Sequence, residues 1–212
     1  MLNLAMPQNS YPRPLPRRFF SQNALEVTRR LIGKTLVRFL DDDILMGKIV
    51  EAEAYIGEND PACHAFRGLT PRTRVMYGPP GFSYVYFTYG MYFMLNAVCE
   101  REGFPAAVLI RAVEPLEGLD KMMELRKIED PLKLANGPGK LCVAFDIKSE
   151  LNAIDLTSKV SNLQLCAGKD VAHVKWTSRV GIREGSDKKW RCFIPGNKFV
   201  SPGKIKLRPR KS

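Results

Sequence analysis

Two glutamates and a tyrosine occupy alternate positions in the stretch VEAEAYIGENDPACHAF, which spans residues 50–66. Side chains alternate between the two faces of an extended strand, so Glu51, Glu53 and Tyr55 share one face. His64, one of two histidines in the chain, follows after a turn-rich connection. Carboxylates beside a tyrosine and a histidine can transfer protons or stabilise positive charge. This segment therefore has the residue types of a catalytic site.

The strand predicted to carry these carboxylates has a second, apolar face. Val50, Ala52 and Ala54 occupy that face, whereas Ile49 falls on the face of the glutamates. Small apolar side chains can pack in the interior, and because Tyr55 and His64 lie close to the glutamates in the sequence, we expect the carboxylates to line a cleft. The alternative is an exposed sheet face with solvated glutamates, which is common for charged residues on strands. By itself, His64 is also compatible with a structural role.

Aromatic residues are concentrated in the segment FSYVYFTYGMYFMLNAV, residues 82–98. Its aromatic and β-branched residues flank a glycine, which predicts a β-hairpin with Tyr89 and Met91 at the tip. A large side chain at such a tip can enter between base pairs. Tyr86, together with Tyr55, can instead provide flat faces for an extracted base. An aromatic cluster that only supports the sheet is the alternative.

The chain carries 33 lysines and arginines against 22 aspartates and glutamates, a formal net charge of +11. This excess attracts polyanions and makes nucleic acid the leading partner, although a basic surface can also serve solubility alone. Two segments suit phosphate contacts: TPRTR at residues 70–74, and NGPGKL at residues 136–141, where backbone N–H groups at a helix start lie beside Lys140. NGPGKL lacks the spacing of a P-loop, so nucleotide hydrolysis is not expected.

The five cysteines and two histidines show no metal-ligand spacing. Because the cysteines are far apart and odd in number, we expect reduced, mostly buried thiols rather than disulfides or a zinc site. No segment has the apolar length of a membrane span, and the amino terminus lacks the apolar run of a signal peptide. We therefore expect no metal, no cofactor and no membrane association.

Helices are predicted in three places. The first covers residues 22–32, with Ser21 as its N-cap and Gly33 beyond its end. A second is predicted over residues 116–128, where apolar residues recur at helical spacing. The third begins at Pro138, which suits a first helical turn.

Strands dominate both ends of the chain. A hairpin is predicted from residues 35–40 and 44–55, a short apolar strand from residues 106–113, and further strands from HVKWTSRVGI and WRCFIPGNKFVS. There is no regular βαβ rhythm. The sequence therefore predicts an α+β fold in a single domain, with a strand-rich mixed or antiparallel sheet, flanking helices and a protruding β-hairpin.

Composition divides the chain into three parts. Residues 1–17 form a proline-rich arm that we expect to be flexible, and residues 202–212 form a basic tail. Residues 18–201 are long enough for one folded domain with a sizeable core.

Four segments in register, VEAEAY with His64, YVYFTYGMYFMLN, AVLIRAVEPLEG and NGPGKLC, resemble the alkyladenine (3-methyladenine) DNA glycosylase family. The resemblance implies a monofunctional base-excision repair enzyme that flips an alkylated or deaminated purine out of double-stranded DNA and hydrolyses its N-glycosidic bond. Such bases include 3-methyladenine, 7-methylguanine, hypoxanthine and ethenoadenine. It further implies a cofactor-independent monomer that is intracellular and located with DNA, in a bacterial cytoplasm or nucleoid or in a eukaryotic nucleus.

The resemblance also implies roles for individual residues. By it, Glu53 activates the attacking water, Arg111 helps to hold that water, and Glu51 supports them. The residues implied to bind the flipped base are Tyr55, His64, Tyr86 and Asn96. The residues implied to intercalate in the DNA are Tyr89 and Met91. The residues implied to contact the DNA backbone are Arg72, Arg126 and Lys140.

Two other functions remain open at the level of sequence. A non-catalytic module that binds damaged DNA needs only the basic surface and the hairpin wedge. A metal-dependent nuclease would gather Glu51, Glu53 and Asp60 around magnesium. Substitution of Glu53 tests the first alternative, and an assay in EDTA tests the second.

Overall fold

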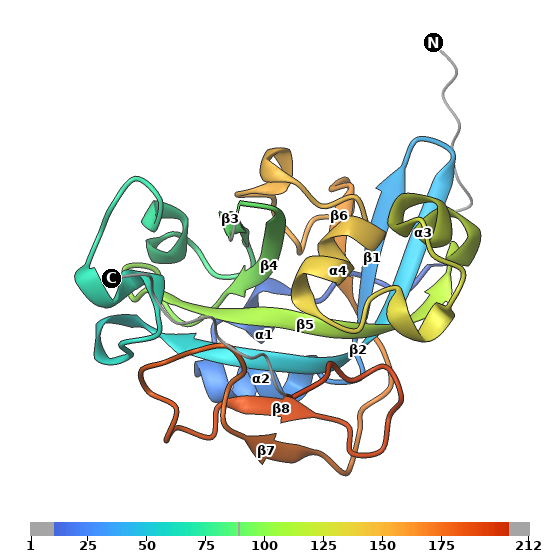
Figure 1. The fold of residues 1–212 in the computed structure, drawn as a ribbon. Coiled ribbons are helices and arrows are strands. Elements are labelled where there is room, and N and C mark those ends of the chain that lie inside the picture. The colour runs from blue at the N-terminus through green and yellow to red at the C-terminus, as the bar shows by residue number, and fades with distance from the viewer. Residues whose placement is uncertain (1–10, 89, 204–212) are drawn as a thin grey trace.

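Eight strands form one antiparallel sheet in the computed structural model, which describes residues 11–88 and 90–203 (Figure 1). Within these residues the strand order is β3-β4-β5-β2-β1-β6, and β8 joins the sheet by pairing with β2 and β7. The strands are β1 Thr35–Leu40, β2 Asp43–Ile56, β3 Ser83–Thr88, β4 Tyr92–Val98, β5 Ala106–Glu117, β6 Leu163–Cys166, β7 Lys175–Thr177 and β8 Arg191–Phe193. The predicted α+β fold is confirmed.

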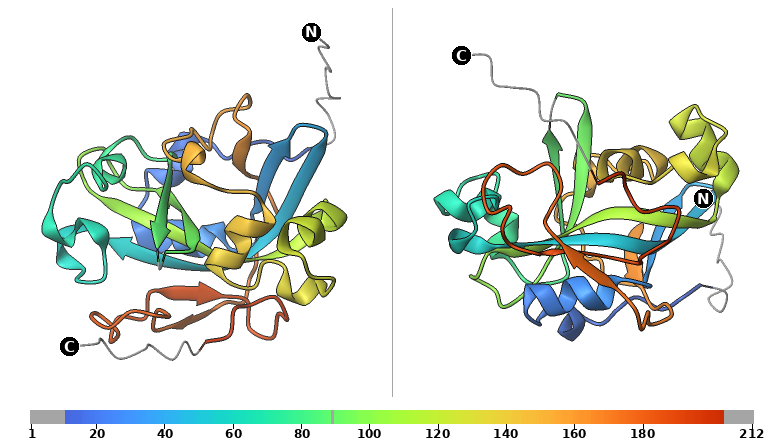
Figure 2. Two further views of the ribbon diagram at one scale, coloured as in Figure 1. Left: turned by 45° about the horizontal axis from the view of Figure 1, so that its top comes forward. Right: turned by 60° about the horizontal axis from the view of Figure 1, so that its bottom comes forward.

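Helices cover both sides of the long strands β2 and β5, with α2 on one side and α3 and α4 on the other (Figures 1 and 2). The α-helices of the described residues are α1 Arg17–Phe20, α2 Ala24–Leu31, α3 Leu119–Arg126 and α4 Pro138–Ala144. The short 3₁₀ helices are η1 Gly57–Asn59, η2 His64–Arg67, η3 Arg74–Tyr77, η4 Pro131–Lys133 and η5 Ser149–Leu151. None of the helices in the described ranges has both the length and the apolar character needed to cross a bilayer.

Helix α2 begins two residues later than the sequence predicts. Its N-cap is Asn23, whose side chain accepts a hydrogen bond from the Leu25 N–H at 3.0 Å, and not Ser21. The preceding helix α1 explains the difference, because Ser21 ends that turn and donates from Oγ to the Arg17 carbonyl. Gly33 does follow the helix, with a φ of +90° that favours glycine.

Strand β2 contains an irregularity that the alternation of its sequence does not predict. The pairing register with β5 shifts between Ile49 and Glu51 and again between Glu51 and Ala52. As a result, Ile49 belongs to the same buried cluster as Ala52 and Ala54, and the prediction that it shares the glutamate face is wrong. The shift lies where the neighbour of β2 changes from β1, along residues 43–48, to β8.

The β3–β4 hairpin confirms the predicted protrusion. Its strands pair with each other from Ser83↔Ala97 to Thr88↔Tyr92, but β4 pairs with β5 only from Asn96 onward. The outer half of the hairpin therefore extends beyond the sheet, as the green strands show (Figure 2).

Strand β5 is longer than predicted, so the helix that follows it begins later in the sequence. It continues to Glu117, which pairs with Met46, so α3 starts at Leu119 and not at residue 116. Gly118 makes the turn with a φ of +76°, and a Cβ at this position would lie 2.4 Å from Leu45 Cδ2. Pairing with β2 thus outweighs the local helical pattern.

The C-terminal part contains less strand than predicted. In HVKWTSRVGI only Lys175–Thr177 forms a strand, β7, and in WRCFIPGNKFVS only Arg191–Phe193 does, as β8. A loop without regular structure joins the two strands over residues 178–190. This loop forms one wall of the site described below.

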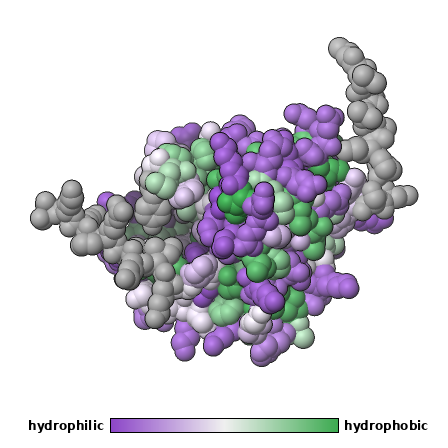
Figure 3. All heavy atoms as spheres, turned by 45° about the vertical axis from the view of Figure 1, so that its right-hand side comes forward, coloured by the Kyte–Doolittle hydropathy of each residue, from purple (hydrophilic) through white to green (hydrophobic). Residues whose placement is uncertain are grey.

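Buried apolar side chains from both helical layers form the main core. Its largest members include Phe20, Leu31, Ile110 and Phe145. All five cysteines are buried and free, as predicted. On the face turned toward α3, by contrast, hydrophilic residues predominate and apolar residues form separate small patches (Figure 3).

Both ends of the chain fall partly outside the described residues, which exclude 1–10 and 204–212. The described part of the predicted arm contacts β6: Leu15 N donates to the Leu165 carbonyl, and Pro14 bridges to Cys166.

Candidate active site

A pocket of about 560 Å³ opens between the hairpin, helix η2 and the loop of residues 178–190. Strand β2 contributes Tyr55, β3 contributes Tyr86, and β5 contributes Arg111. His64 from η2 and Val180 from the loop complete the wall. Four of the residues predicted from the sequence thus meet in one cavity.

Aromatic rings form one side of this pocket. The rings of His64 and Tyr86 are 4.4 Å apart at an angle of 74°, and Nδ1 of His64 lies 2.8 Å from the Tyr84 hydroxyl. Part of His64 remains exposed at the mouth, but burial of its ring and then the charge of Arg72 lower its pKa. The imidazole is therefore neutral at pH 7.

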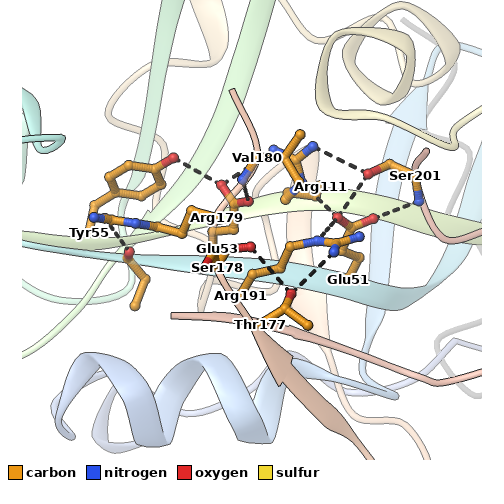
Figure 4. A network of polar contacts seen from close by, with 11 residues as sticks. Glu51, Glu53, Tyr55, Arg111, Thr177, Ser178, Arg179, Val180, Arg191 and Ser201 are labelled. Atoms are coloured by element: carbon orange, nitrogen blue, oxygen red, sulfur yellow. Dashed lines mark hydrogen bonds and ion pairs between the residues drawn. The ribbon is translucent and has the colours of Figure 1, made fainter. Parts of the chain in front are cut away.

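Glu53 lies buried directly beneath the pocket, and the three groups that contact its carboxylate all belong to lining residues (Figure 4). Oε1 accepts from the Val180 N–H at 2.7 Å, and Oε2 accepts from the Tyr55 hydroxyl at 2.9 Å. Arg111 Nη1 lies 3.3 Å from Oε2. Burial raises the pKa of Glu53 above its usual value despite these three contacts.

Tyr55 keeps its proton in this position. Burial, and then the neighbouring charge of Glu53, raise the pKa of the Tyr55 hydroxyl well above its usual value. The hydroxyl therefore acts as a donor to Glu53 and fixes the plane of that carboxylate.

Glu51 lies two residues away and has much stronger partners. Its Oε1 accepts from Arg111 Nε at 2.7 Å, Arg191 Nε at 2.6 Å and Ser201 Oγ at 2.8 Å, while Oε2 accepts from the Ser201 N–H at 2.7 Å. Burial opposes ionisation, but the two arginines and these hydrogen bonds outweigh it and hold the pKa of Glu51 below its usual value. Glu51 is therefore a stable anion.

Arg111 connects the two carboxylates. Its Nε pairs with Glu51, its Nη1 faces Glu53, and its Nη2 donates to Ser201 Oγ at 3.2 Å. The side chain also lines the pocket. An arginine held in this way presents positive charge to the pocket in a fixed orientation.

Asn96 lies beside the main pocket and not in its wall. Its side chain is buried and donates to the Tyr84 carbonyl at 2.9 Å. Together with Tyr55, His64 and Tyr86 it lines a small adjoining cavity of about 20 Å³.

The hairpin tip carries exposed apolar side chains above the pocket. Met91 is 63% exposed, and Phe87 and Tyr92 are exposed as well. The structural environment of Tyr89, which the sequence places at the tip, lies outside the described residues.

The three cations predicted to contact DNA have different environments. Arg72 is exposed, and its guanidinium lies 5.2 Å from the centre of the Tyr86 ring at the pocket. Arg126 is partly buried and donates from Nε to the Leu134 carbonyl at 2.9 Å. Lys140 donates from Nζ to Asn136 Oδ1 at 2.7 Å at the start of α4.

Several residues of the site are not predicted from the sequence. Arg191 and Ser201 hold Glu51, while Val180 and Arg179 lie in a segment predicted as strand. The only local signal is the pair of glycines, Gly181 and Gly185, that interrupts the strand-like pattern around Arg179. These residues come together only through long-range pairing.

The carboxylates proposed for magnesium binding do not converge. Asp60 is paired with Arg179, and Glu51 with Arg111 and Arg191. Across the described parts of the chain, no group of three or more histidine, cysteine, aspartate or glutamate residues is placed to hold a metal ion.

The site as a whole can bind a flat ring and place a carboxylate beside it. Aromatic faces suit a planar or cationic ligand. A buried carboxylate with a raised pKa is a stronger proton acceptor than a free one, and it also stabilises positive charge that develops close by.

Comparison with known proteins identifies close relatives over most of the chain. A sequence model of the family described as methylpurine-DNA glycosylase matches residues 18–198. A protein of Methanocella arvoryzae is 47% identical over 198 residues, which cover 90% of this chain and 98% of the relative. A protein of Carboxydothermus hydrogenoformans is 45% identical over 190 residues, or 88% of this chain and 98% of the relative. Both relatives carry the name "Putative 3-methyladenine DNA glycosylase".

Proposed function

This chain belongs to the methylpurine-DNA glycosylase family, and from that premise we propose that it is a 3-methyladenine DNA glycosylase that hydrolyses the N-glycosidic bond of damaged purines. Family membership makes DNA the partner, in keeping with a net charge of +11. The observation that carries the proposed mechanism is the position of Glu53, buried under an aromatic pocket with its carboxylate held by Tyr55, Val180 and Arg111.

The pocket takes a purine that has been flipped out of the duplex. The base lies against the rings of Tyr55 and Tyr86, with His64 at its edge and Asn96 beyond it. A purine alkylated at a ring nitrogen carries positive charge, which favours contact with tyrosine faces. The neutral imidazole of His64 adds no repulsion to such a base.

Glu53 and Arg111 carry out the hydrolysis. As the bond between C1′ and the base nitrogen breaks, its electron pair leaves with the base and positive charge develops on the sugar. The nearby carboxylate stabilises this charge, a water oxygen bonds to C1′, and Glu53 accepts the water proton. Among the described residues the pocket lining includes no lysine, which agrees with water as the nucleophile.

Surface residues hold the DNA around the pocket. Met91 at the hairpin tip, together with Tyr89, fills the gap that the extruded nucleotide leaves. Arg72, Arg126 and Lys140 supply positive charge for backbone phosphates. The protein acts as a monomer, without a cofactor, and is located with the DNA inside the cell.

The test is a panel of duplexes that each carry one modified purine, incubated with the protein in excess EDTA. We expect free base to be released from at least the 3-methyladenine and hypoxanthine duplexes, and the Glu53→Gln variant to bind them without release. Binding without release by the unaltered protein would instead identify a non-catalytic damage-binding module. Strand cleavage that EDTA abolishes would identify a nuclease.

A further inference from the structure

The wall of the pocket that carries Val180 depends on a buried ion pair. Arg179 and Asp60 have fully buried side chains, and the guanidinium is bidentate: Nη1 lies 2.5 Å from Oδ2 and Nη2 lies 2.7 Å from Oδ1. The two residues are 119 positions apart in the sequence. This pair joins the loop of residues 178–190 to the segment that follows β2.

Asp60 organises the opposite wall of the pocket. Its carboxylate also accepts from the Ile56 N–H at 3.3 Å and the Ala62 N–H at 3.2 Å. These contacts fix the turn between the end of β2 and the pocket residues that begin at Pro61. The same carboxylate therefore binds both walls.

Arg179 also supports Tyr55. Its Nη1 donates to the Ala54 carbonyl at 3.0 Å, and its Cζ lies 4.6 Å from the centre of the Tyr55 ring (Figure 4). The guanidinium lies 5.0 Å from the centre of the Trp190 ring as well. Arg179 therefore restrains the tyrosine at the pocket surface.

Both neutral donors to Glu53 are adjacent to this arginine. The Val180 N–H, which binds Oε1, belongs to the next residue in the chain. The Tyr55 hydroxyl, which binds Oε2, belongs to the ring on which the guanidinium packs. A shift of Arg179 would move both donors together.

The close fit of Gly185 shows that the loop closes tightly on the pair. A Cβ at this glycine would lie 3.0 Å from Arg179 Nη2 and 3.4 Å from Asp60 Oδ1. Its φ of +65° also disfavours other residues. A larger side chain at this position would therefore have to displace the ion pair.

Stability alone gives little reason to keep such a pair. Well-packed apolar residues often replace buried ion pairs without loss of stability, because removing two charges from water is costly. A bidentate arginine does provide fixed geometry that lysine cannot reproduce. The pair is therefore better explained by the fixed positions that it gives to the groups around it.

We propose that Asp60 and Arg179 are positioning residues that orient the Glu53 carboxylate, by holding the Val180 N–H against one of its oxygens and the Tyr55 hydroxyl against the other. This role deepens the proposed function and rests on it. Neither residue needs to touch the DNA substrate.

Arg179→Lys tests this role, with Arg17→Lys as the control at a more exposed arginine–aspartate pair outside the pocket lining. Arg17 likewise pairs with an aspartate, Asp155, donates to a backbone carbonyl and packs over a phenylalanine ring. We expect Arg179→Lys to slow single-turnover base release about tenfold to a hundredfold, the size of effect that a small displacement of a catalytic group produces. We expect Arg17→Lys to leave the rate unchanged.

A second readout needs no activity. Lysine keeps the positive charge but weakens the two hydrogen bonds to Glu53, so the pKa of Glu53, followed by carboxyl-carbon NMR in DNA-free protein, should rise. A pKa that stays constant or falls, or a rate equal to that of Arg17→Lys, would overturn the proposed role. If the unaltered protein released no base, the proposed function would fail, while the titration would still decide whether the pair orients Glu53.

Asp60→Asn serves as the second variant if Arg179→Lys does not fold. Asparagine keeps one acceptor oxygen and the volume of the side chain but loses the charge that holds the guanidinium. We expect the same direction of change in the rate and in the pKa of Glu53. Thermal unfolding of each variant verifies that the domain is folded at the assay temperature.

Discussion

Glu51 and Glu53 lie two residues apart on the same strand, yet their surroundings differ sharply. Glu51 accepts hydrogen bonds from two arginines and from the N–H and the hydroxyl of Ser201. Glu53 has one arginine at 3.3 Å and two neutral donors. Both are buried, but the pKa of Glu51 is lowered and that of Glu53 is raised. Burial alone therefore does not set the direction in which the pKa of a carboxylate shifts, because the charge of its partners can outweigh it.

From this difference we infer separate tasks for the two residues. A carboxylate that four strong donors saturate has little capacity left to accept a proton, and it serves to hold Arg111 in place. A carboxylate under a pocket with a raised pKa is suited to act as a base. Substitutions and changes of pH can test whether the two glutamates differ in this way.

The largest effect is expected for Glu53→Gln. Removal of a general base should lower the single-turnover rate of base release by about 10²–10⁴-fold. Because the folded-state pKa of Glu53 is raised, its stabilising contribution is present at low pH and lost as pH rises through that pKa, so the neutral glutamine should not reduce stability at pH 7. A rate within tenfold of the unaltered protein would contradict the assignment.

Glu51→Gln should have the opposite profile. Loss of one partner from a buried ion pair leaves Arg191 without its counterion, at a cost of about 3–5 kcal/mol in the free energy of unfolding. The rate should fall only about tenfold in the folded fraction, through displacement of Arg111. Urea denaturation measures the first quantity and single-turnover kinetics the second. Equal stability of the Glu51→Gln and Glu53→Gln variants would remove the distinction.

Acidification should separate activity from stability. The base must be ionised, so the rate should fall as pH falls through the pKa of Glu53, which lies above the usual 4.5. The contribution of Glu51 to stability is present above 4.5 and lost as pH falls through its lower folded-state pKa. Rate and free energy of unfolding, measured on the same pH series, should therefore decline at different pH values. Coincident midpoints would indicate that activity is lost only through unfolding.

The smallest effect is expected at the hairpin tip. Met91→Ala should weaken binding to a lesion duplex a few-fold, by about 1 kcal/mol, because it removes apolar surface that packs against DNA. Leu116→Ala is the control, since Leu116 is also about half exposed but lies at the end of β5. Fluorescence anisotropy measures both affinities. Equal effects of the two substitutions would argue against a role of the tip in DNA binding.

The sequence predicts the sheet well where partners are close along the chain. The hairpins around the DDD turn and around Gly90 depend on local alternation and turn residues, and both form as predicted. The shift in pairing register at Val50 does not follow from the alternation of the sequence. It lies where the strand that pairs with β2 changes from β1 to β8. The late start of α3 likewise depends on the pairing of Glu117 with Met46.

The site follows the same rule. Tyr55 and Glu53 are near neighbours on β2, and the aromatic pattern of the hairpin adds Tyr86. The family resemblance adds Arg111, and both Tyr86 and Arg111 line the same pocket as Tyr55. The burial of Glu51 depends on Arg191 and Ser201, which lie 140 and 150 positions away. No local pattern encodes contacts at such separations, so periodicity alone made an exposed glutamate face a reasonable alternative.

Direct titration of the two glutamates tests whether Glu53 is a catalytic base and Glu51 a structural anion. Carboxyl-carbon NMR of the DNA-free protein, with Glu51→Gln and Glu53→Gln used to assign the resonances, follows each group separately. We expect the pKa of Glu53 to lie above 4.5 and that of Glu51 to lie below it. If Glu53 titrates below Glu51, the division between a catalytic base and a structural anion is wrong.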